Sequence, residues 1–220
     1  MTEKELRNKI VSNAVAYLGA KESDGSFKII IDTYNTITPL PRKYKVRYTD
    51  AWCAAFVSAI FKMSNLIQII PPECSCFFMI EGFKKLGRWE EKDSYIPKEG
   101  DVIFYDWDDS GKGDNVGTPD HVGIVEHVSS NVITVIEGNY SDSVKRRNIP
   151  VDGKYIRGFG KPDYAALAST TAPWYVKDGS WADGTKLGFV DGNRPDAYAT
   201  RAEVNVMILR AIDYLRKEGV

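Results

Sequence analysis

The apolar pattern of this 220-residue chain changes at Pro97, and this change constrains the fold more than any other feature of the sequence. Before Pro97 the apolar residues recur at helical spacing, whereas after it they form short runs rich in β-branched residues and separated by turn residues. Helices are expected over 2–18, 27–34, 50–61 and 76–86, and strands over 102–104, 122–128, 132–136, 144–149 and 155–159. Helices followed by an antiparallel sheet predict an α+β fold in which the helices pack on the sheet.

Cys53 lies at the first turn of an apolar segment, 50–61, that is typical of a buried helix. Thr49 or Asp50 can cap this helix, which would leave Cys53 within about three residues of the positive end of the helix dipole. A thiolate is an anion that such a position favours. A single cysteine among alanines is more often a small buried hydrophobe, so a catalytic role depends on partners elsewhere in the chain.

One of the two histidines, His121, opens a strand-like run, and a second run ends in Ile136-Glu137-Gly138-Asn139. If the two strands pair, the carboxylate of Glu137 and the amide of Asn139 come within reach of the imidazole. Thiol, imidazole and carboxylate are the parts of a cysteine nucleophile system. The other histidine, His127, would share this face of a regular strand but lie about 20 Å along it, at about 3.3 Å per residue, and we expect it to be structural or exposed.

Four blocks of sequence carry a resemblance to a known family. In the family's order and spacing, they are Asp50-Ala51-Trp52-Cys53 with Ala55-Phe56-Val57-Ser58, Pro97-Lys98-Glu99-Gly100-Asp101-Val102-Ile103-Phe104, Asp120-His121-Val122-Gly123-Ile124-Val125 and Ile136-Glu137-Gly138-Asn139-Tyr140. Roughly the first three quarters of the chain resembles the cysteine, histidine-dependent amidohydrolase/peptidase (CHAP) domain of the papain-like group. The resemblance implies that Cys53 is the nucleophile, His121 the general base and acid, and Glu137 the residue that orients the histidine. Asn139 matches a further polar position beside the imidazole.

The resemblance also implies a substrate. Members of the family cleave amide bonds in bacterial peptidoglycan, as N-acetylmuramoyl-L-alanine amidases or as peptidoglycan endopeptidases, and the residues do not indicate which bond is cut. His121 would take the thiol proton, Cys53 would attack the carbonyl, and backbone N–H groups at the helix start would stabilise the oxyanion. Two alternatives stay open: a non-catalytic wall-binding or structural protein that keeps the fold, and an intracellular cysteine amidase acting on a small conjugate.

Composition and charge limit the classes of protein and partner that are consistent with this sequence. A hydrophobic content of 43% is enough for one sizeable core and a second small module. The formal net charge of -1 argues against a nucleic-acid partner. The lack of an apolar run of about eighteen residues argues against a membrane span. The three cysteines argue against a disulfide framework. Cys74 and Cys76 have no histidine nearby to complete a zinc site, and we expect them to be packing or incidental thiols.

The start of the chain, Met1-Thr2-Glu3-Lys4-Glu5, predicts a helix with a capping box rather than a secretory signal. We therefore expect synthesis in the host cytoplasm without a signal peptide and action on the cell wall after release, as in a bacteriophage endolysin. The alternative is that a signal sequence has been removed.

The acidic loop 106–114 has oxygen-bearing residues at several positions of a calcium-binding pattern and glycine at the sixth position. The twelfth position is Gly117, where the pattern needs a bidentate glutamate. The family members that bind calcium do so at an acidic stretch before the cysteine, and here that stretch, 41–47, is basic. We expect no metal and no cofactor, and a solvated hairpin loop at 106–114.

The composition near 165–172 predicts a linker between a catalytic domain at 1–164 and a small helical module at 173–220. Within the module, Trp181-Ala182, the turn at 188–192, Pro195 and Thr200-Arg201-Ala202-Glu203 resemble a single S-layer homology repeat. The resemblance implies binding of a secondary wall polymer, with Trp181 and Arg201 as candidate contacts. Because working repeats of this kind usually come in threes, we expect either homo-oligomerisation through the module or a helical cap that packs on the catalytic domain.

Overall fold

The computed structural model of the chain describes residues 1–109, 117–170, 208–210, 212 and 217. The chain divides into two compact units, Met1–Ala168 and Ser169–Val220. In the second unit, residues 208–210, 212 and 217 are helical. Trp181, Arg201 and the rest of the predicted repeat lie outside the described residues.

The first part of the chain is helical, as predicted. The helices are α1 (Glu3–Ala16), α2 (Lys28–Tyr34), α3 (Cys53–Met63) and α4 (Cys76–Lys85), with short 3-10 turns at Glu22–Asp24, Pro41–Lys43 and Ile67–Ile69. α1 begins with the expected capping box: the Thr2 hydroxyl accepts a hydrogen bond from the Glu5 N–H, and the Glu5 carboxylate accepts one from the Thr2 N–H. Local spacing and capping signals therefore located these helices well.

Six strands form one antiparallel sheet with the order β1-β6-β2-β3-β4-β5. They are β1 (Trp89–Glu90), β2 (Val102–Tyr105), β3 (His121–Ser129), β4 (Val132–Glu137), β5 (Lys145–Pro150) and β6 (Ile156–Gly160). The five longer strands match the predicted runs, whereas β1 is too short to show an alternating pattern. The predicted α+β arrangement is confirmed for the described residues.

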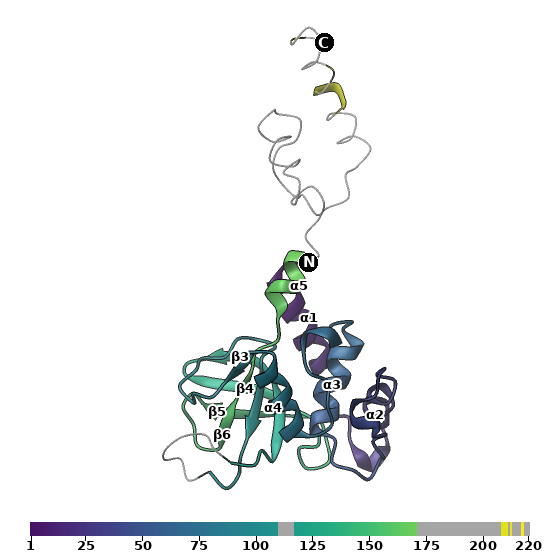
Figure 1. Cartoon of the computed structure of the whole chain (residues 1–220), viewed down its shortest axis with the longest axis vertical. Coiled ribbons are helices and arrows are strands. Elements are labelled where there is room, and N and C mark those ends of the chain that lie inside the picture. The colour runs from purple at the N-terminus through teal and green to yellow at the C-terminus, as the bar shows by residue number, and fades with distance from the viewer. Residues whose placement is uncertain (110–116, 171–207, 211, 213–216, 218–220) are drawn as a thin grey trace. The chain divides into compact units, whose positions relative to one another are not determined.

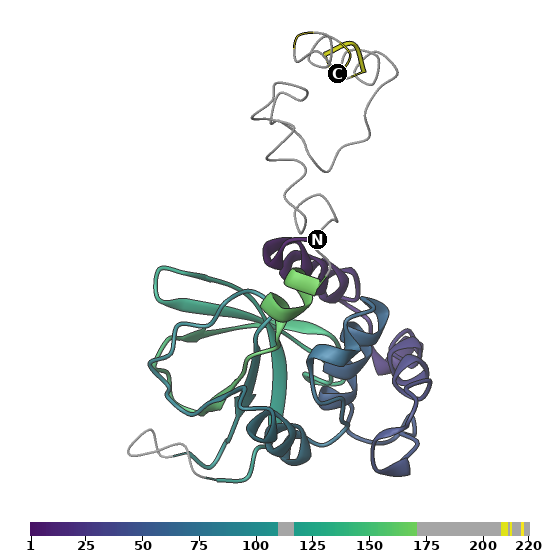
Figure 2. The same cartoon turned by 45° about the horizontal axis from the view of Figure 1, so that its top comes forward.

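Both faces of the sheet are buried, each in a different core. On one face, alternate residues such as Val102, Phe104 and Val122 pack with the helices. On the other face, residues such as Ile103 and Phe159 pack among themselves. Figure 1 shows the helices gathered beside the sheet, and Figure 2 shows that the sheet is curved.

α3 is apolar on nearly all sides. Every residue from Cys53 to Phe61 is buried, because the helix lies between α2 on one side and β3 on the other. A helix that is hydrophobic all round is stable only in such a buried position. The fold thus carries Cys53 to the end of β3 at which His121 lies.

The prediction that Thr49 or Asp50 caps α3 is wrong. The helix begins after Trp52, whose side chain forms no capping hydrogen bond. Asp50 lies too early in the chain, and its carboxylate instead accepts hydrogen bonds from the backbone and guanidinium of Arg47. The first N–H groups of α3 are therefore not capped by a side chain at the point where Cys53 lies.

α5 (Tyr164–Thr170) occupies most of the stretch that we predicted to be a linker. Tyr164 is fully buried, its hydroxyl donates to the Gly100 carbonyl oxygen at 2.8 Å, and the guanidinium of Arg7 lies 4.3 Å from its ring centre. These contacts join the start of α5 to the first unit. The stretch 165–172 is thus helical as far as Thr170, because burial of one aromatic side chain outweighs its small polar residues.

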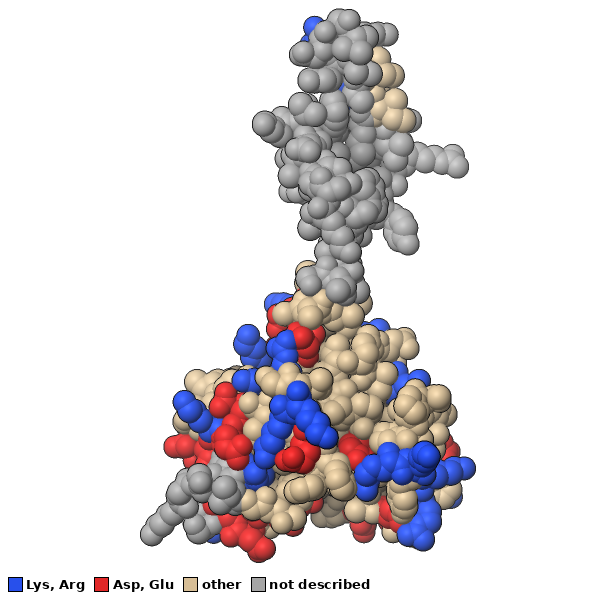
Figure 3. Space-filling model, in the orientation of Figure 1, with Lys and Arg blue, Asp and Glu red and all other residues tan. Residues whose placement is uncertain are grey.

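The face of the first unit that Figure 3 shows carries charges of both signs. Opposite charges often lie side by side, as in the ion pairs of Arg146 with Glu126 and of Lys84 with Glu81. Within the described ranges, no helix is long and apolar enough to cross a membrane.

Candidate active site

The pairing of β3 with β4 brings His121 and Glu137 together. Ile124 lies opposite Ile136, and the same antiparallel register places Gly123 opposite Glu137. A Cβ atom on Gly123 would lie 2.8 Å from Cγ of Glu137, so glycine leaves the room that this side chain needs. Oε2 of Glu137 lies 3.1 Å from Nε2 of His121, as the predicted strand pairing requires.

α3 brings the thiol of Cys53 to the same imidazole. At the end of β4, Gly138 packs so closely on α3 that a Cβ atom there would lie 2.4 Å from Cβ of Phe56. Because Glu137 occupies Nε2 of His121, the ring nitrogen Nδ1 is left for the thiol. The thiol and the imidazole interact strongly enough that each shifts the pKa of the other.

The three side chains are buried, with Cys53 7% exposed, His121 8% and Glu137 0%. Burial alone would lower the pKa of His121, but hydrogen bonds with the Cys53 thiol and the Glu137 carboxylate raise this pKa to about 9. Burial likewise opposes ionisation of Glu137, yet hydrogen bonds from His121 and Arg147 keep the pKa of the carboxyl below its ordinary value. Glu137 therefore stays ionised beside a histidine that stays protonated at neutral pH.

Cys76 contacts the candidate nucleophile, which the sequence did not predict. Its Sγ atom lies 3.7 Å from Sγ of Cys53, because α3 and α4 each begin at a cysteine and their first turns meet. A hydrogen bond from Cys76 is the main cause that holds the pKa of Cys53 well below its ordinary value; burial opposes this shift and His121 adds to it. Cys76 is buried in the core, as the packing alternative expects, but its contact with Cys53 was not predicted. Cys74 lies beside the guanidinium of Arg42, with Nη2 3.3 Å from Sγ.

The pair of sulfur atoms is not symmetric. The pKa of Cys76 is raised well above its ordinary value, chiefly by the neighbouring Cys53 and also by burial. Cys53 alone also has His121 and the Ala54 N–H as hydrogen-bond partners. The negative charge therefore resides on Cys53 and the proton on Cys76.

Arg147 on β5 supports Glu137 from the side away from the histidine. Its Nε atom donates to Oε1 of Glu137 at 2.7 Å. Its guanidinium lies 4.1 Å from the ring centre of Tyr140 and 5.1 Å from that of Trp107. Both carboxylate oxygens of Glu137 are thus held by cationic partners, one by His121 and one by Arg147.

Sequence reasoning missed Arg147 because two arginines stand side by side in β5. The β4–β5 register decides between them: Arg147 lies opposite Val135 and hence on the face of Glu137. Arg146 turns to the other face and pairs with Glu126 at 2.6 Å. The only sign of this contact in the sequence is a cationic residue in the strand after Glu137. The pairing of β4 with β5 was needed to decide which arginine faces Glu137.

A hollow of about 320 Å³ opens beside the imidazole. It is lined by Trp107, His121, Asn139, Tyr140, Ser141 and Arg147. Asn139 has a left-handed backbone conformation, with φ of 58°, and none of the hydrogen bonds within the described part of the chain joins its side chain to His121. Glu137, rather than Asn139, therefore holds the ring in this structure.

Aromatic side chains restrict the plane of the imidazole. Tyr105 lies opposite His121 in the β2–β3 ladder and stacks on it, with ring centres 6.0 Å apart and an angle of 28° between the planes. Trp107 stacks in turn on Tyr105, with centres 5.1 Å apart. Packing as well as hydrogen bonding therefore positions the ring, and sequence reasoning found neither Tyr105 nor Trp107.

In the described part of the acidic loop, carboxylates accept hydrogen bonds from backbone N–H groups. Oδ1 of Asp106 accepts from the Asp108 N–H, and Oδ2 of Asp109 accepts from the Tyr155 N–H, each at 3.0 Å. Residues 110–116 of the predicted hairpin loop lie outside the described ranges. Among the residues that the structure describes, no group of three His, Cys, Asp or Glu side chains is placed to hold a metal ion.

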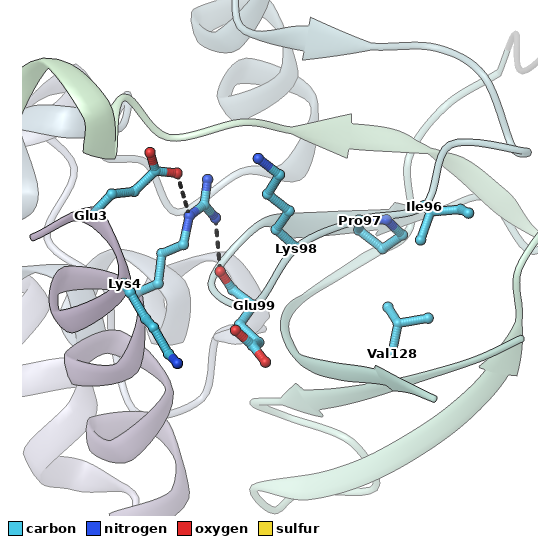
Figure 4. Close-up of a pocket in the computed structure, with 8 residues that line it drawn as sticks. Glu3, Lys4, Ile96, Pro97, Lys98, Glu99 and Val128 are labelled. Atoms are coloured by element: carbon cyan, nitrogen blue, oxygen red, sulfur yellow. Dashed lines mark hydrogen bonds and ion pairs between the residues drawn. The ribbon is translucent and has the colours of Figure 1, made fainter. Parts of the chain in front are cut away.

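A larger hollow, of about 560 Å³, lies at the first turns of α1 (Figure 4). It is lined by Glu3, Lys4, Arg7, Ile96, Pro97, Lys98, Glu99 and Val128. Arg7 is already engaged there, by Glu3 at 2.8 Å and by Asp101 at 3.0 Å. Since no thiol or imidazole lines this hollow, we assign it to the joint between α1 and the sheet rather than to catalysis.

Similar solved structures share only a limited likeness with this chain. One is an NlpC/P60 family protein from Bacillus cereus ATCC 10987, with 14% identity and a TM-score of 0.39 over 71% of this chain and 40% of that one. Another is Ly7917, with 15% identity and a TM-score of 0.40 over 71% of this chain and 62% of that one. The structure of Ly7917 with the hydrolyzing product of MDP gives a TM-score of 0.41 over the same shares. The chain thus spans less than two thirds of the length of each.

Comparison of the sequence with known families is more specific. No curated protein sequence matches the chain. Residues 43–139 match the CHAP domain family, and this stretch contains Cys53, His121, Glu137 and Asn139. The resemblance of the four sequence blocks is therefore confirmed at the level of the CHAP domain, over residues 43–139.

Proposed function

We propose that the first unit hydrolyses amide bonds of bacterial peptidoglycan with Cys53 as the nucleophile. The observation that carries this proposal is the buried arrangement in which His121 interacts with the Cys53 thiol and lies 3.1 Å from the Glu137 carboxylate. The match of residues 43–139 to the CHAP domain family supports wall amides as the substrate class. The narrower choices, muramoyl-alanine amidase or endopeptidase and phage endolysin, stay predictions.

In the proposed mechanism, the Cys53 thiolate attacks the amide carbonyl and forms a tetrahedral intermediate. Backbone N–H groups in the first turn of α3, whose N-cap residue Trp52 forms no side-chain capping hydrogen bond, donate hydrogen bonds to the oxyanion. His121, as imidazolium, gives its proton to the leaving amine and then takes a proton from the water that hydrolyses the thioester. Glu137 stays ionised throughout and holds the imidazole in place.

The main rival is a non-catalytic wall-binding protein that keeps the fold. Burial of a thiolate, an imidazolium and a carboxylate is unfavourable in free energy, and a binding surface does not need such buried charges. Shifted pKa values gathered around one imidazole are more typical of a reacting site. The arrangement of Cys53, His121 and Glu137 therefore favours the enzyme.

Substitution of Cys53 by Ala tests the proposal. We expect Cys53→Ala to lose wall-clearing activity by at least about a thousandfold while keeping its circular dichroism spectrum, because only one small side chain leaves the start of α3. Turbidity of a purified wall suspension measures the activity. The matched control is Cys74→Ala, which should clear walls at the wild-type rate.

The fragments released from the wall identify the bond that is cut. New amino groups at L-alanine, identified by mass spectrometry, indicate a muramoyl-alanine amidase, and new amino groups within the peptides indicate an endopeptidase. Cleavage of small conjugates with intact walls would favour the intracellular amidase. Clearing by Cys53→Ala near the wild-type rate would exclude Cys53 as nucleophile.

For the second unit we propose wall targeting, on the resemblance of 173–220 to an S-layer homology repeat with Trp181 and Arg201 as candidate contacts. A wall-binding module raises the local enzyme concentration on an insoluble substrate without changing the chemistry. Because Tyr164 joins α5 to the first unit, the informative truncation removes 171–220. We expect the truncated protein to cut soluble fragments at nearly the full-length rate and intact cells more slowly, whereas equal loss on both would favour a packing cap.

A further inference from the structure

The hollow beside His121 carries a positive charge that the proposed mechanism does not use. Arg147 lines this hollow, and its side chain is 24% exposed. Within the described part of the chain its only hydrogen bond runs from Nε to Glu137, so both Nη groups remain as donors toward a ligand. Among the described residues that line the hollow, none is acidic.

Aromatic side chains surround the guanidinium of Arg147. Tyr140 and Trp107 lie 4.1 and 5.1 Å from it, measured to the ring centres. Lys145 stands two residues earlier on β5, hence on the same face, and its Nζ lies 5.6 Å from the Tyr140 ring centre. An anionic ligand in this hollow would therefore meet the guanidinium of Arg147 beside aromatic walls, whereas Lys145 lies beside Tyr140 and does not itself line the hollow.

We propose that this hollow is a subsite for a carboxylate of the substrate, carried on the peptide next to the amide that is cut. The carboxylate would accept hydrogen bonds from the Nη groups of Arg147, whose planar fork matches a carboxylate better than a point charge does. The inference rests on the proposed function, because the amide must lie at Cys53. It deepens that function by predicting a preference for peptides with a free acid over peptides amidated at the same position.

Two peptides that differ only by a carboxylate or a carboxamide at this position test the subsite. We expect wild-type kcat/KM to be about tenfold or more higher for the acid, the scale of one charged hydrogen bond. Arg147→Lys, which keeps the charge beside Glu137 but loses the fork, should remove most of this preference. The matched control is Arg146→Gln on the opposite face, which should keep it.

Two further measurements separate the subsite from the chemistry. The rate of Cys53 alkylation by iodoacetamide, a neutral reagent, should change less than about threefold in Arg147→Lys if the ion pair of Cys53 and His121 is intact. Calorimetry with Cys53→Ala measures binding of both peptides without turnover. Acid-selective binding without hydrolysis by the wild type would overturn the proposed function and keep the subsite, whereas equal affinity for acid and amide would overturn the subsite.

A separate observation concerns the two cysteines at the helix starts. Sγ of Cys53 and Sγ of Cys76 lie 3.7 Å apart, and the two residues are 7% and 8% exposed. A disulfide has a sulfur–sulfur distance of about 2.05 Å, so a small movement of the two side chains would join them. In the proposed mechanism Cys76 donates a hydrogen bond to the Cys53 sulfur and does not itself react.

We infer that Cys53 and Cys76 form a reversible redox switch with hydrogen peroxide as the oxidant. The Cys53 thiolate attacks the peroxide to give a sulfenic acid, with loss of hydroxide that a proton converts to water. The Cys76 sulfur then attacks the Cys53 sulfur, forms the disulfide and releases a second water. Two thiols and one peroxide thus give one disulfide and two waters, and the nucleophile is blocked until a dithiol reduces it.

Peptide mapping tests this switch in the full-length protein. We expect peroxide to inactivate the wild type with formation of a cross-link between the tryptic peptides 48–62 and 63–84, and dithiothreitol to reverse both changes. Cys74→Ser, which removes the other cysteine of the second peptide, should behave in the same way. In Cys76→Ser, peroxide should drive Cys53 to sulfinic and sulfonic acids that dithiothreitol does not reduce.

The measurement of mass does not depend on the activity of the enzyme. Oxidation of wild-type Cys53 to sulfinic acid without a cross-link would overturn the switch. A cross-link that persists in Cys76→Ser would also overturn it, because Cys74 would then be the partner.

Discussion

The two ends of the β3–β4 ladder carry histidines in different surroundings. At one end His121 is buried and contacts Glu137. At the other end His127 is exposed, and its Nε2 atom lies 3.3 Å from Oγ1 of Thr134. The register shifts between Val125 and His127, so the two ends belong to different stretches of regular pairing. As expected, His127 is exposed.

The comparison shows that a position on this strand does not by itself make a histidine a catalytic base. His121 has an elevated pKa of about 9 because a thiol and a carboxylate face it in a buried place, where these interactions outweigh the loss of hydration. The exposed end has water as an alternative partner for every polar group. Because β5 pairs with β4 at both ends, the contact with α3, rather than the histidine itself, distinguishes the two ends.

Substitution of each histidine by alanine should show the largest difference between the two ends of the ladder. We expect His121→Ala to lower kcat on wall fragments by about a thousandfold or more, because the proton acceptor and donor is lost. His127→Ala should stay within about twofold of the wild type. Turnover of soluble wall fragments, followed by mass spectrometry, measures both, and comparable losses in the two variants would show that the site is not at the buried end.

Substitution of the carboxylate should have a smaller effect. We expect Glu137→Gln to lower kcat by about 10- to 100-fold, because the amide can still hold the ring but no longer stabilises imidazolium or pairs with Arg147. The alkaline limb of its pH profile should move to lower pH, since the pKa of His121 loses one of its raising partners. A Glu137→Gln enzyme that matched the wild type at every pH would transfer the orienting role to Asn139.

The smallest expected effect concerns how the activity and stability of the wild type depend on pH. The pKa of His121 is raised from 6.5 to about 9, so wild-type activity should fall roughly tenfold per unit only above about pH 9, where the imidazolium is lost. By the same shift, the stability from this histidine is fully present below pH 6.5 and is lost as pH rises through about 9. On the acid side, activity should fall where the Cys53 thiolate is protonated, below the ordinary cysteine pKa.

Initial rates and thermal unfolding, measured from pH 5 to 10, test both statements. An alkaline limb near pH 6.5 would mean that His121 titrates as an isolated histidine. Such a result would contradict the ion pair and leave the two ends of the ladder chemically alike.

The sequence by itself determined the type of each longer element and the three residues of the candidate site. The helical spacing before Pro97 and the β-branched runs after it depend on neighbours a few residues apart, so they can be read from the chain. The pairing of two adjacent strands then sufficed to bring His121 to Glu137. The fold class and the order of the longer elements followed from the same local patterns.

Only the tertiary structure decided which residues surround this group. The cysteines of α3 and α4 meet because two helix starts pack together, and the sequence separation of 23 residues gives no sign of that contact. The choice of Arg147 over Arg146 depends on the β4–β5 register, in which a shift of one residue would reverse the faces. Local propensity acts over a few residues, whereas these contacts are selected by the packing of the whole unit, and for that reason the chain alone did not reveal them.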